Sequence, residues 1–564
     1  MFFPEKLTCR WIASAYSDGM TPYDLLDEII RRADAEDDKN IWIVKPSKEL
    51  CSKYIDRLPK DKSSLPLWGI PFAIKDNIDL EGVPTTAACP DYAYTPEKNS
   101  FVVQKLIDAG AIPVGKTNLD QFATGLVGTR SPYGEVHNAY QPELISGGSS
   151  SGSAVSVALG MAAFALGTDT AGSGRVPAML NTLVGYKPPL GSWSTSGVVP
   201  ACASLDCVTV FANDLEEARL VDKYAKGFDN DCIWSRKYEQ KGDKLPEKVY
   251  VSKDEPRFFG DYADIYRKKW YNAVRRIESL GVKTERIDCS MFEKAALILY
   301  EGAYVAERWQ DLKEFIENNP GKTFPVTEQI LRSGAKDEQT AAKLFENLHE
   351  LQYYRHKTKE ILDNAVIIMP TAGGTFTREQ VRNDPVNTNS LMGLYTNHCN
   401  LLDLAAVDIP ENSGDRQNPF GITVFALCDS ENLMCAFAEK FLSSESMKIA
   451  VCGLHKKGRA LESQLTELGG EFVEHARTSK NYRLYKLNTT PVKPGLIKST
   501  GMGNNIEVDV YTLAKNKFGR FFEQVKSPLV LGDVELESGE IVKGFLCEPD
   551  AVKDAQDITD KGAF

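Results

Sequence analysis

The sequence predicts an α/β protein with a large domain over residues 1–442 and a small one over 447–564. Between Leu67 and Leu190, short apolar runs alternate with Gly-rich turns and helical stretches, as expected of a sheet flanked by helices. After the polar segment SSES, a new strand-like run, MKIAVCG, opens a region with several further short strands. A chain of 564 residues also exceeds the size of one ordinary domain.

Helices are predicted over most of the first sixty residues. Thr21-Pro22 is typical of a helix start, and apolar residues follow it at helical spacing: Leu25, Leu26, Ile29 and Ile30. The small apolar residues from Ala154 to Gly167 predict a tightly packed core helix.

Helical periodicity returns between residues 254 and 365, for example over 265–280 and 337–361. Strands are predicted at 365–374 and 420–427. In the small domain the predicted strands are YRLYKL, IEVDVYTL and EIVKGFLCEP.

Composition excludes several classes of function. The net charge is −12, from 66 basic and 78 acidic residues, which argues against a broad nucleic-acid surface. No apolar run reaches the ~18–20 residues that a membrane helix needs, and the start, MFFPEKLTCRW, lacks the apolar stretch of a signal peptide. We therefore expect a cytoplasmic protein that contacts no membrane. The twelve cysteines form no zinc-type cluster and are expected to be free thiols, with no metal site.

The most informative segment runs from Ser146 to Pro177, SGGSSSGSAVSVALGMAAFALGTDTAGSGRVP. Its second part, Gly167 to Ser173, is a turn of small residues. Such a turn can hold a serine hydroxyl beside unpaired backbone N–H groups, as an oxyanion hole requires. Taken alone, each piece is more often an ordinary loop.

Three motifs in the same order resemble the amidase-signature family: GIPFAIKDNI at 69–78, then GGSSSGS, then DTAGSGRVP. The resemblance implies a mixed central sheet flanked by helices. It makes Lys75 the base, Ser149 the bridging serine (after a cis peptide bond in that family) and Ser173 the nucleophile. The oxyanion hole would consist of backbone amides around Thr170, Ala171 and Gly172.

The chemistry suits those roles. A serine becomes nucleophilic when a neighbouring base takes its proton, and a neutral lysine can do so. Neutrality near pH 7 requires the lysine pKa to fall from ~10.4 by about three units. Burial amid Ile70, Phe72, Ala73 and Ile74 is a sufficient cause, because desolvation disfavours the ammonium form.

A second motif suggests nucleotide binding instead of amide hydrolysis. The sequence GAIPVGKT at 110–117 matches the P-loop pattern of nucleotide-binding proteins. A P-loop follows a strand and opens a helix, whereas FVVQKLIDAG before it is helical in period and AIPV itself is strand-like. We predict no nucleotide site and no other cofactor.

The rest of the chain resembles the allophanate hydrolase family, in DQFATGLVGTRSPYGEVHN (120–138), in the helical segment YEGAYVAERW (300–309) and throughout the small domain. The resemblance implies that Tyr300 and Arg308, loosely on one helix face, clamp the carboxylate of allophanate. Gly125 would offer its carbonyl to a substrate N–H. The alternative is that Arg308 pairs with Glu301 or Glu307 on a solvated helix.

The implied reaction releases ammonia and leaves N-carboxycarbamate, which breaks down to carbon dioxide and a second ammonia. A biotin-dependent urea carboxylase would supply the substrate, as a separate or fused polypeptide, and a homodimer is expected. The small domain would resemble the γ-glutamyl-cyclotransferase-like fold. Its His455, beside Lys456 and Lys457, is a candidate acid or base; the alternative is an exposed, idle side chain in a stabilising domain.

Two other interpretations share part of this pattern. The first is another amidase, or the amidase-type subunit of a glutamine-dependent amidotransferase, which has the Lys–Ser–Ser core but gives no reason for the last ~120 residues. The second is a non-catalytic binding protein, against which the intact Lys75, Ser149 and Ser173 argue.

Overall fold

The computed structural model describes residues 3–564 except 243, 303, 413 and 500. It divides into two compact units, Met1–Glu439 and Lys440–Phe564, which are described separately.

The larger unit is built on an eleven-stranded sheet with the order β1-β3-β2-β4-β6-β5-β10-β11-β9-β7-β8. Neighbours β2 and β3, β2 and β4, β7 and β8, and β7 and β9 run parallel, while β4–β6, β5–β6, β5–β10, β10–β11 and β9–β11 are antiparallel. This confirms the predicted α/β fold with a mixed sheet. The strands are β1 (Trp42–Val44), β2 (Pro71–Lys75), β3 (Ile112–Thr117), β4 (Phe164–Asp169), β5 (Val184–Lys187), β6 (Cys207–Ala212), β7 (Lys248–Ser252), β8 (Lys283–Ile287), β9 (Ala365–Pro370), β10 (Leu404–Pro410) and β11 (Gly421–Leu427).

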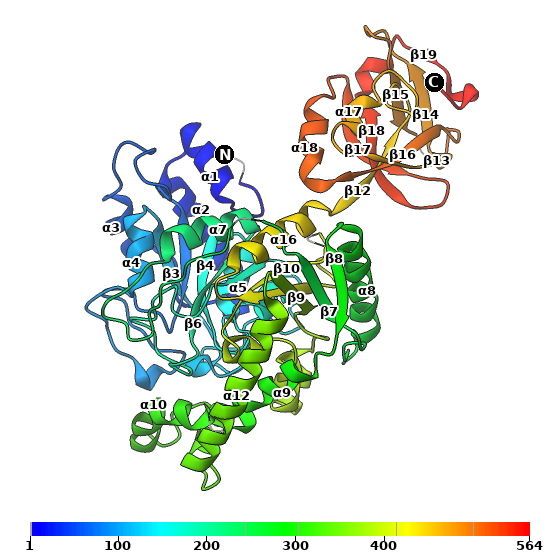
Figure 1. Ribbon diagram of the computed structural model, residues 1–564. Coiled ribbons are helices and arrows are strands. Elements are labelled where there is room, and N and C mark those ends of the chain that lie inside the picture. Colours follow the sequence, from blue (N-terminus) through cyan, green and yellow to red (C-terminus); the bar gives the residue numbers. More distant parts are fainter. Residues whose placement is uncertain (1–2, 243, 303, 413, 500) are drawn as a thin grey trace. The chain divides into compact units, whose positions relative to one another are not determined.

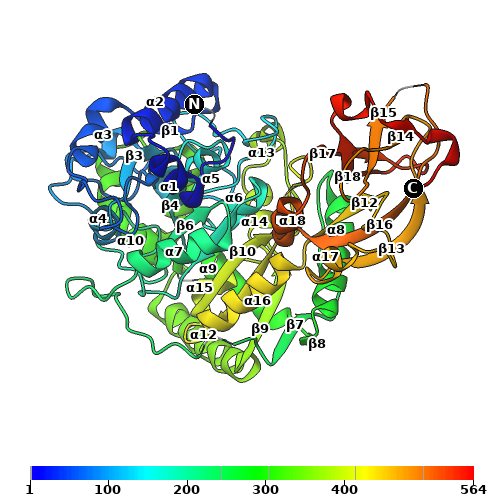
Figure 2. The same cartoon turned by 90° about the horizontal axis from the view of Figure 1, so that it is seen from above.

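Helices cover both faces of this sheet. On one face α7 and α16 lie side by side (Figure 2), and Arg219 of α7 approaches Glu439 of α16 at 3.9 Å. Helices α9, α10 and α12 gather beyond one end of the strands (Figure 1). The α-helices are α1 (Cys9–Ser17), α2 (Pro22–Ala35), α3 (Lys48–Ile55), α4 (Phe101–Asp108), α5 (Ser151–Ala158), α6 (Val176–Leu180), α7 (Leu215–Ala225), α8 (Ala263–Ser279), α9 (Ser290–Glu301), α10 (Tyr304–Asn318), α11 (Pro325–Arg332), α12 (Ala341–Leu362), α13 (Arg378–Asn383), α14 (Asn387–Met392), α15 (His398–Leu401) and α16 (Glu431–Ser443).

Local sequence explains the start of α2. Thr21 caps the helix: its side chain accepts from the Asp24 amide, and the Asp24 carboxylate accepts from the Thr21 amide at 2.9 Å. Pro22 occupies the first helical position, where its missing N–H costs nothing. The helix start predicted at Thr21-Pro22 is therefore confirmed.

Two predicted helices are wrong in extent. The core helix predicted over 154–167 ends at Ala158, because Gly160 adopts φ +65° in the left-handed region, and β4 begins at Phe164. The single helix predicted over 300–309 breaks at Gly302, whose backbone is extended. Glycine is a weak helix former, and a Cβ at Gly302 would meet the Ile298 carbonyl oxygen at 2.5 Å.

Parallel pairing of β2 and β4 places the functional segments together. Their register pairs Phe72 with Phe164 and Ile74 with Leu166. Because parallel strands end at the same edge of a sheet, Lys75 at the end of β2 emerges beside the end of β4. Helix α5 packs on β2, β3 and β4 and brings the Gly/Ser-rich segment to this edge.

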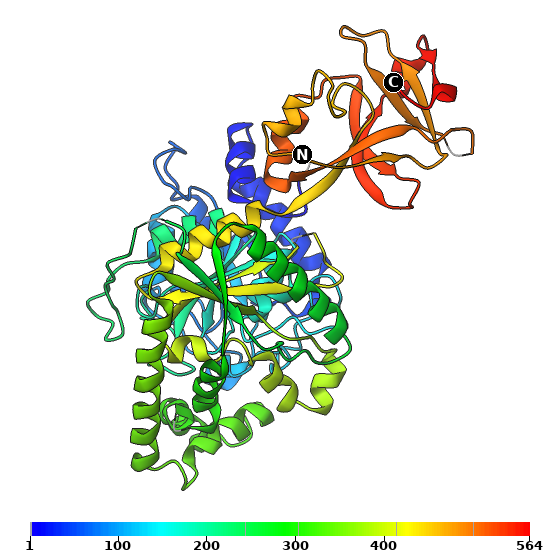
Figure 3. The ribbon, with the colours of Figure 1, turned by 45° about the vertical axis from the view of Figure 1, so that its right-hand side comes forward.

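The smaller unit contains a five-stranded sheet, β13-β16-β12-β18-β17, and a three-stranded sheet, β15-β14-β19. Alternate residues of β12 face two cores: Ile449 and Val451 pack with Leu465 of α17 and Phe521 of α18, whereas Ala450 packs with Leu484. The two helices thus lie on the same side of the larger sheet (Figure 3). Its elements are β12 (Ser446–Val451), α17 (Ser463–Thr466), β13 (Glu471–Arg477), β14 (Tyr482–Lys486), β15 (Pro494–Lys498), β16 (Glu507–Ala514), α18 (Lys515–Glu523), β17 (Leu529–Glu535), β18 (Ile541–Cys547) and β19 (Gln556–Asp557).

Over the part of the chain that the structure describes, no helix has both the length and the apolar character needed to cross a bilayer. The same residues hold no group of His, Cys, Asp and Glu side chains suited to a metal ion.

Candidate active site

Lys75 is the centre of a buried polar cluster. Its side chain is 0% exposed, and its Nζ donates hydrogen bonds to Ser149 Oγ and Thr168 Oγ1, each at 2.7 Å. Burial lowers the pKa of Lys75 to about 7, while the carboxylates of Asp120, Asp206 and Asp169 oppose that shift. Near neutral pH a large fraction of this amine is therefore uncharged and has a lone pair to accept a proton.

Ser149 opens the turn before α5 and follows a cis peptide bond with Gly148, as predicted. Its carbonyl accepts a hydrogen bond from the Asp120 amide at 3.1 Å. There is no room for a side chain at Gly148, where a Cβ would lie 2.0 Å from Asp120 Oδ2. The glycine thus allows its backbone to lie close to the Asp120 carboxylate, and in this position Ser149 Oγ reaches Lys75 Nζ.

Ser173 lies in the turn after β4 and is 4% exposed. Its Oγ donates to the Gly125 carbonyl oxygen at 3.4 Å, and no hydrogen bond joins it to Ser149 among the described contacts. The structure therefore brings Ser173 to Gly125, and Lys75 to Ser149. The relay from Ser149 to Ser173 remains a prediction.

The Asp169 carboxylate holds the Ser173 turn in shape. It accepts from the amides of Gly172 (2.7 Å) and Gly174 (3.0 Å) and pairs with Arg175 at 2.9 Å, with both side chains fully buried. Burial alone would raise the pKa of Asp169, but Arg175 and the amides outweigh it and the pKa is lowered. The pair is thus charged at neutral pH.

The predicted oxyanion hole is available only in part. The Gly172 amide is engaged by Asp169. Among the described residues, the amides of Thr170, Ala171 and Ser173 meet no acceptor. Asp206 holds the turn from the other side, accepting from the Thr170 hydroxyl and from the Ala201 amide at 2.7 Å.

Arg308 and Tyr300 approach each other from two successive helices, not from one. The guanidinium carbon lies 5.6 Å from the Tyr300 ring centroid. Arg308 is 3% exposed and donates to the Ala201 carbonyl (3.1 Å) and to Thr124 Oγ1 (2.7 Å). Glu307 instead accepts from the Ser204 amide and hydroxyl. Arg308 makes no ion pair with any described carboxylate; the Glu301 side chain lies outside the described residues.

The P-loop-like segment has a structural role. Residues of GAIPVGKT form β3, after the helix α4, as predicted. Lys116 is fully buried and pairs with Asp76 at 3.1 Å. Its ammonium group is therefore occupied inside the protein.

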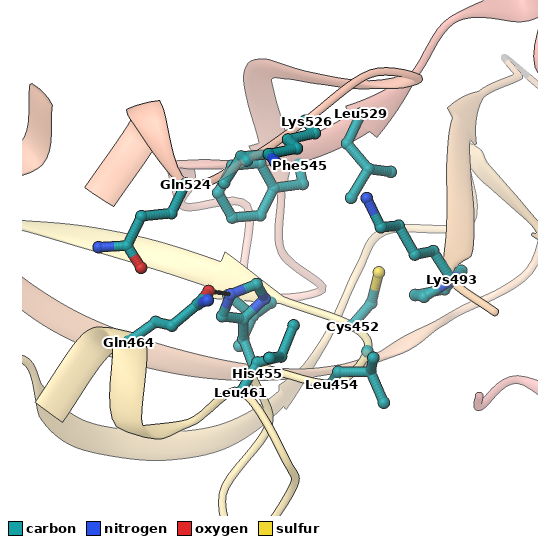
Figure 4. A pocket seen from close by; sticks show the side chains of 14 residues that line it. Cys452, Leu454, His455, Leu461, Gln464, Lys493, Gln524, Lys526, Leu529 and Phe545 are labelled. Atoms are coloured by element: carbon teal, nitrogen blue, oxygen red, sulfur yellow. Dashed lines mark hydrogen bonds between the residues drawn. The ribbon is translucent and has the colours of Figure 1, made fainter. Parts of the chain in front are cut away.

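In the smaller unit His455 lines a cavity of about 70 Å³ (Figure 4). Its Nε2 lies 2.8 Å from Gln464 Oε1, and burial lowers its pKa. The expected alternative of an exposed side chain is wrong. The lysines that line the cavity are Lys493 and Lys526.

The lysines that sequence placed beside His455 point elsewhere. Lys456 approaches Glu507 at 3.6 Å, and Lys457 lies over the Phe472 ring at 4.2 Å. Adjacency in sequence misled here, because successive residues of a turn project in different directions, whereas Lys493 reaches the cavity from the segment just before β15.

Sequence reasoning missed Thr168, Asp169, Asp120 and Thr124. Asp169 and Arg175 stand inside the motif DTAGSGR, and their opposite charges could have indicated a pair. Thr124 and Thr168 carry no signal, since only tertiary packing brings them to Arg308 and Lys75.

A buried lysine beside one serine, a second serine and three backbone amides without acceptors among the described residues are the groups that acyl transfer to a serine requires, as in an amide hydrolase. Comparison with known families agrees: residues 24–435 match the amidase family, and residues 447–564 match the allophanate hydrolase C-terminal domain. The chain belongs to the amidase family and has the C-terminal domain found in allophanate hydrolases.

Similar proteins support this placement over nearly the whole chain. Urea amidolyase of Saccharomyces cerevisiae is 39% identical over 96% of this chain and 32% of its own length. The solved structure of Kluyveromyces lactis allophanate hydrolase matches with a TM-score of 0.71 and 36% identity, covering 99% of this chain and 98% of that one. A glutamyl-tRNA(Gln) amidotransferase chain of Methanosarcina acetivorans is 40% identical, but over 39% of this chain and 48% of its own. The chain spans about a third of the length of the urea amidolyase that it matches.

Proposed function

We propose that this chain hydrolyses allophanate, releasing ammonia from its terminal amide. The observation that carries the proposal is the buried guanidinium of Arg308. It donates a hydrogen bond to Thr124 and forms no ion pair among the described residues. Thr124 adjoins Gly125, whose carbonyl faces Ser173. A buried cation connected through Thr124 and Gly125 to a candidate nucleophilic serine suits a small amide that ends in a carboxylate.

In the proposed reaction neutral Lys75 accepts the proton of Ser149 as Ser149 takes that of Ser173. Ser173 Oγ then attacks the terminal amide carbon of the substrate. The amides of Thr170, Ala171 and Ser173 stabilise the oxyanion; Gly172 can join them only by releasing Asp169. The leaving amine of this tetrahedral intermediate receives a proton from Lys75 through the two serines. The C–N bond then breaks, ammonia leaves, and an acyl ester remains on Ser173.

Water then completes the cycle. Lys75, through Ser149, accepts the proton of a water that attacks the ester carbon, and Ser173 is regenerated with N-carboxycarbamate as product. During binding Arg308 and the Tyr300 hydroxyl would hold the substrate carboxylate, and the Gly125 carbonyl would accept from a substrate N–H.

We further propose that the small domain promotes breakdown of N-carboxycarbamate to carbon dioxide and ammonia. His455 would act as the acid or base, and its cavity also presents Lys493 and Lys526, which suit a dianion (Figure 4). The catalytic domain would be residues 1–442 and this second domain 447–564. A biotin-dependent urea carboxylase would make the substrate, and the enzyme would act in the cytoplasm as a homodimer.

The test compares ammonia release from allophanate and from propionamide by the wild type and Arg308→Met, with the exposed Arg332→Met as control. We expect the wild type to prefer allophanate and Arg308→Met to lose that preference through a raised KM. If propionamide is hydrolysed equally well and Arg308→Met changes nothing, the substrate assignment is wrong. Release of ammonia from glutamine in preference to allophanate would favour the amidotransferase alternative.

A further inference from the structure

Two buried arginines hold Thr124 at the end of the site where we place the substrate carboxylate. Arg308 donates to the Thr124 hydroxyl at 2.7 Å, and Arg130 donates to the Thr124 carbonyl at 2.9 Å. Their exposed fractions are 3% for Arg308 and 2% for Arg130. Two guanidinium groups therefore converge on one buried residue.

Arg130 is incompletely paired. Its Nη2 donates to the Pro385 carbonyl at 2.6 Å, and its Nε has no hydrogen-bond partner among the described residues. No ion pair joins it to a described carboxylate. Burial lowers the pKa of Arg130, and the charge of Asp120 opposes this shift. Since a guanidinium stays protonated in proteins, the group is a buried positive charge.

The neighbouring carboxylates are engaged with other donors. Asp120 accepts from the backbone amides of Val127, Gly128 and Arg130 at 2.9–3.2 Å. Asp206 accepts from the Thr170 hydroxyl and from the backbone amides of Ala201 and Cys202, and burial raises its pKa to about 6. Amide donors do not neutralise a carboxylate, so the charge of Asp120 still acts on Arg130. Over the described residues, however, neither arginine forms an ion pair.

The loop that Arg130 anchors also carries Gly125. Arg130 ties Thr124 to Pro385, and the Leu126 amide donates to Asn389 Oδ1 at 2.7 Å. These bonds fix the segment on both sides of the Gly125 carbonyl, which Ser173 contacts. A shift of Thr124 would move both Gly125 and the hydroxyl that Arg308 uses.

We propose that Arg130 is a specificity-determining and positioning residue that selects anionic over neutral amides. It fixes Thr124 for Arg308 and adds a second buried cation, and a bound carboxylate forms the ion pair that neither arginine makes with a described residue. Two buried cations that make no ion pair among the described residues are costly, so a site of this kind favours a ligand that carries a carboxylate. The inference rests on the proposed function for the identity of the substrate.

Binding by the inactive Ser173→Ala protein tests this without turnover. Malonamate, the mono-amide of malonic acid, replaces the central N–H of allophanate by a methylene group, and malonamide is its neutral counterpart. Calorimetric titration of both ligands would compare Ser173→Ala alone with the same protein carrying Arg130→Met or Arg130→Lys. Arg332→Met in the same background is the control for loss of an exposed arginine.

We expect Arg130→Met to weaken malonamate binding by about ten-fold or more and malonamide binding by less than about three-fold, with Arg130→Lys restoring part of the difference. An equal loss for both ligands would mean a purely structural role, and unchanged affinities, or no binding of malonamate to Ser173→Ala, would also overturn the proposal. If Arg130→Met fails to fold, the affinity ratio in Arg130→Lys decides. Failure of the proposed function shows separately, as no ammonia from allophanate with the wild type.

Discussion

Lys75 in the larger unit and His455 in the smaller one are both bases whose pKa is lowered by burial, but their surroundings differ. Lys75 is fully enclosed at the joined ends of two parallel strands, and serine and threonine hydroxyls lie 2.7 Å from its Nζ. His455 is partly buried in a turn after β12 and borders a cavity, with the Gln464 amide oxygen as its polar partner.

The two sites differ in what determines the protonation of the basic side chain: the fold for Lys75, and a bound ligand for His455. Around Lys75, burial outweighs the opposing charges of three carboxylates of the protein, so the fold itself sets the lysine pKa at about 7. At His455 one wall is a cavity with Lys493 and Lys526, and an anion bound there would favour the protonated imidazole. We infer that the first site is preorganised, whereas the second changes its protonation with its ligand.

The largest effect is expected at Ser173. Ser173→Ala removes the proposed nucleophile and should lower kcat for allophanate by about 10⁴-fold or more. The free energy of unfolding should stay the same. Ser156→Ala is the matched control, because Ser156 is also buried and its hydroxyl donates to the Ser153 carbonyl, its one hydrogen-bond partner among the described residues. Initial rates of ammonia release measure both. Substantial activity in Ser173→Ala would show that Ser173 is not the nucleophile.

Loss of Lys75 should rank next. Lys75→Met removes the proposed base, so we expect kcat/KM to fall by about 10²–10⁴-fold. In the wild type kcat/KM should rise as the pH passes through about 7, where Lys75 loses its proton. A pH profile without that limb, or one that Lys75→Met retains, would contradict the role of Lys75.

The same pKa predicts a stability difference. The folded pKa lies below the unfolded value, so the unfolded chain binds more protons between about pH 7 and 10. The free energy of unfolding of the wild type should therefore rise with pH across this window, by up to about 1.4 kcal/mol per unit from this group. Denaturant titrations of Lys75→Met should show a smaller rise, and equal slopes would exclude the shifted pKa.

Asp169 should matter mainly for stability. Asp169→Asn leaves Arg175 buried without its counter-charge, and we expect a loss of about 3–5 kcal/mol in the free energy of unfolding. Asp91→Asn breaks the exposed pair with Lys322 and should cost about 0–1 kcal/mol. Chemical denaturation compares the two, and similar losses would mean that Asp169 does not organise the turn.

The smallest effect should fall on the second unit. His455→Ala should leave release of the first ammonia unchanged and slow release of the second, because we propose that the two steps use different sites. Separate measurement of ammonia and carbon dioxide over time detects this, with the exposed His356→Ala as control. If both products are released at unchanged rates, His455 takes no part in the reaction.

The sequence allowed the main features of the larger unit to be predicted because they reside in contiguous motifs. Lys75, Ser149 and Ser173 are each marked by their own segment, and the mixed sheet follows from the family that these motifs resemble. The ends of helices were less predictable: Gly160 and Gly302 interrupt stretches whose apolar spacing favours a helix.

Contacts made across long distances in sequence were not predictable. Arg308 reaches Thr124 from 184 residues further along the chain, and Lys493, not the neighbouring Lys456 or Lys457, lines the His455 cavity. Single polar residues in such positions look like ordinary loop residues in sequence, since their meaning arises only when the sheet is formed.

The most direct test of the central claim is covalent labelling with a serine-reactive fluorophosphonate, followed by peptide mass spectrometry. We predict one label per chain, at Ser173, with a rate that rises through about pH 7 and falls strongly in Lys75→Met. Labelling at another serine, or equal labelling of Ser173 in Lys75→Met, would contradict the assignment of a lysine-activated serine to this site.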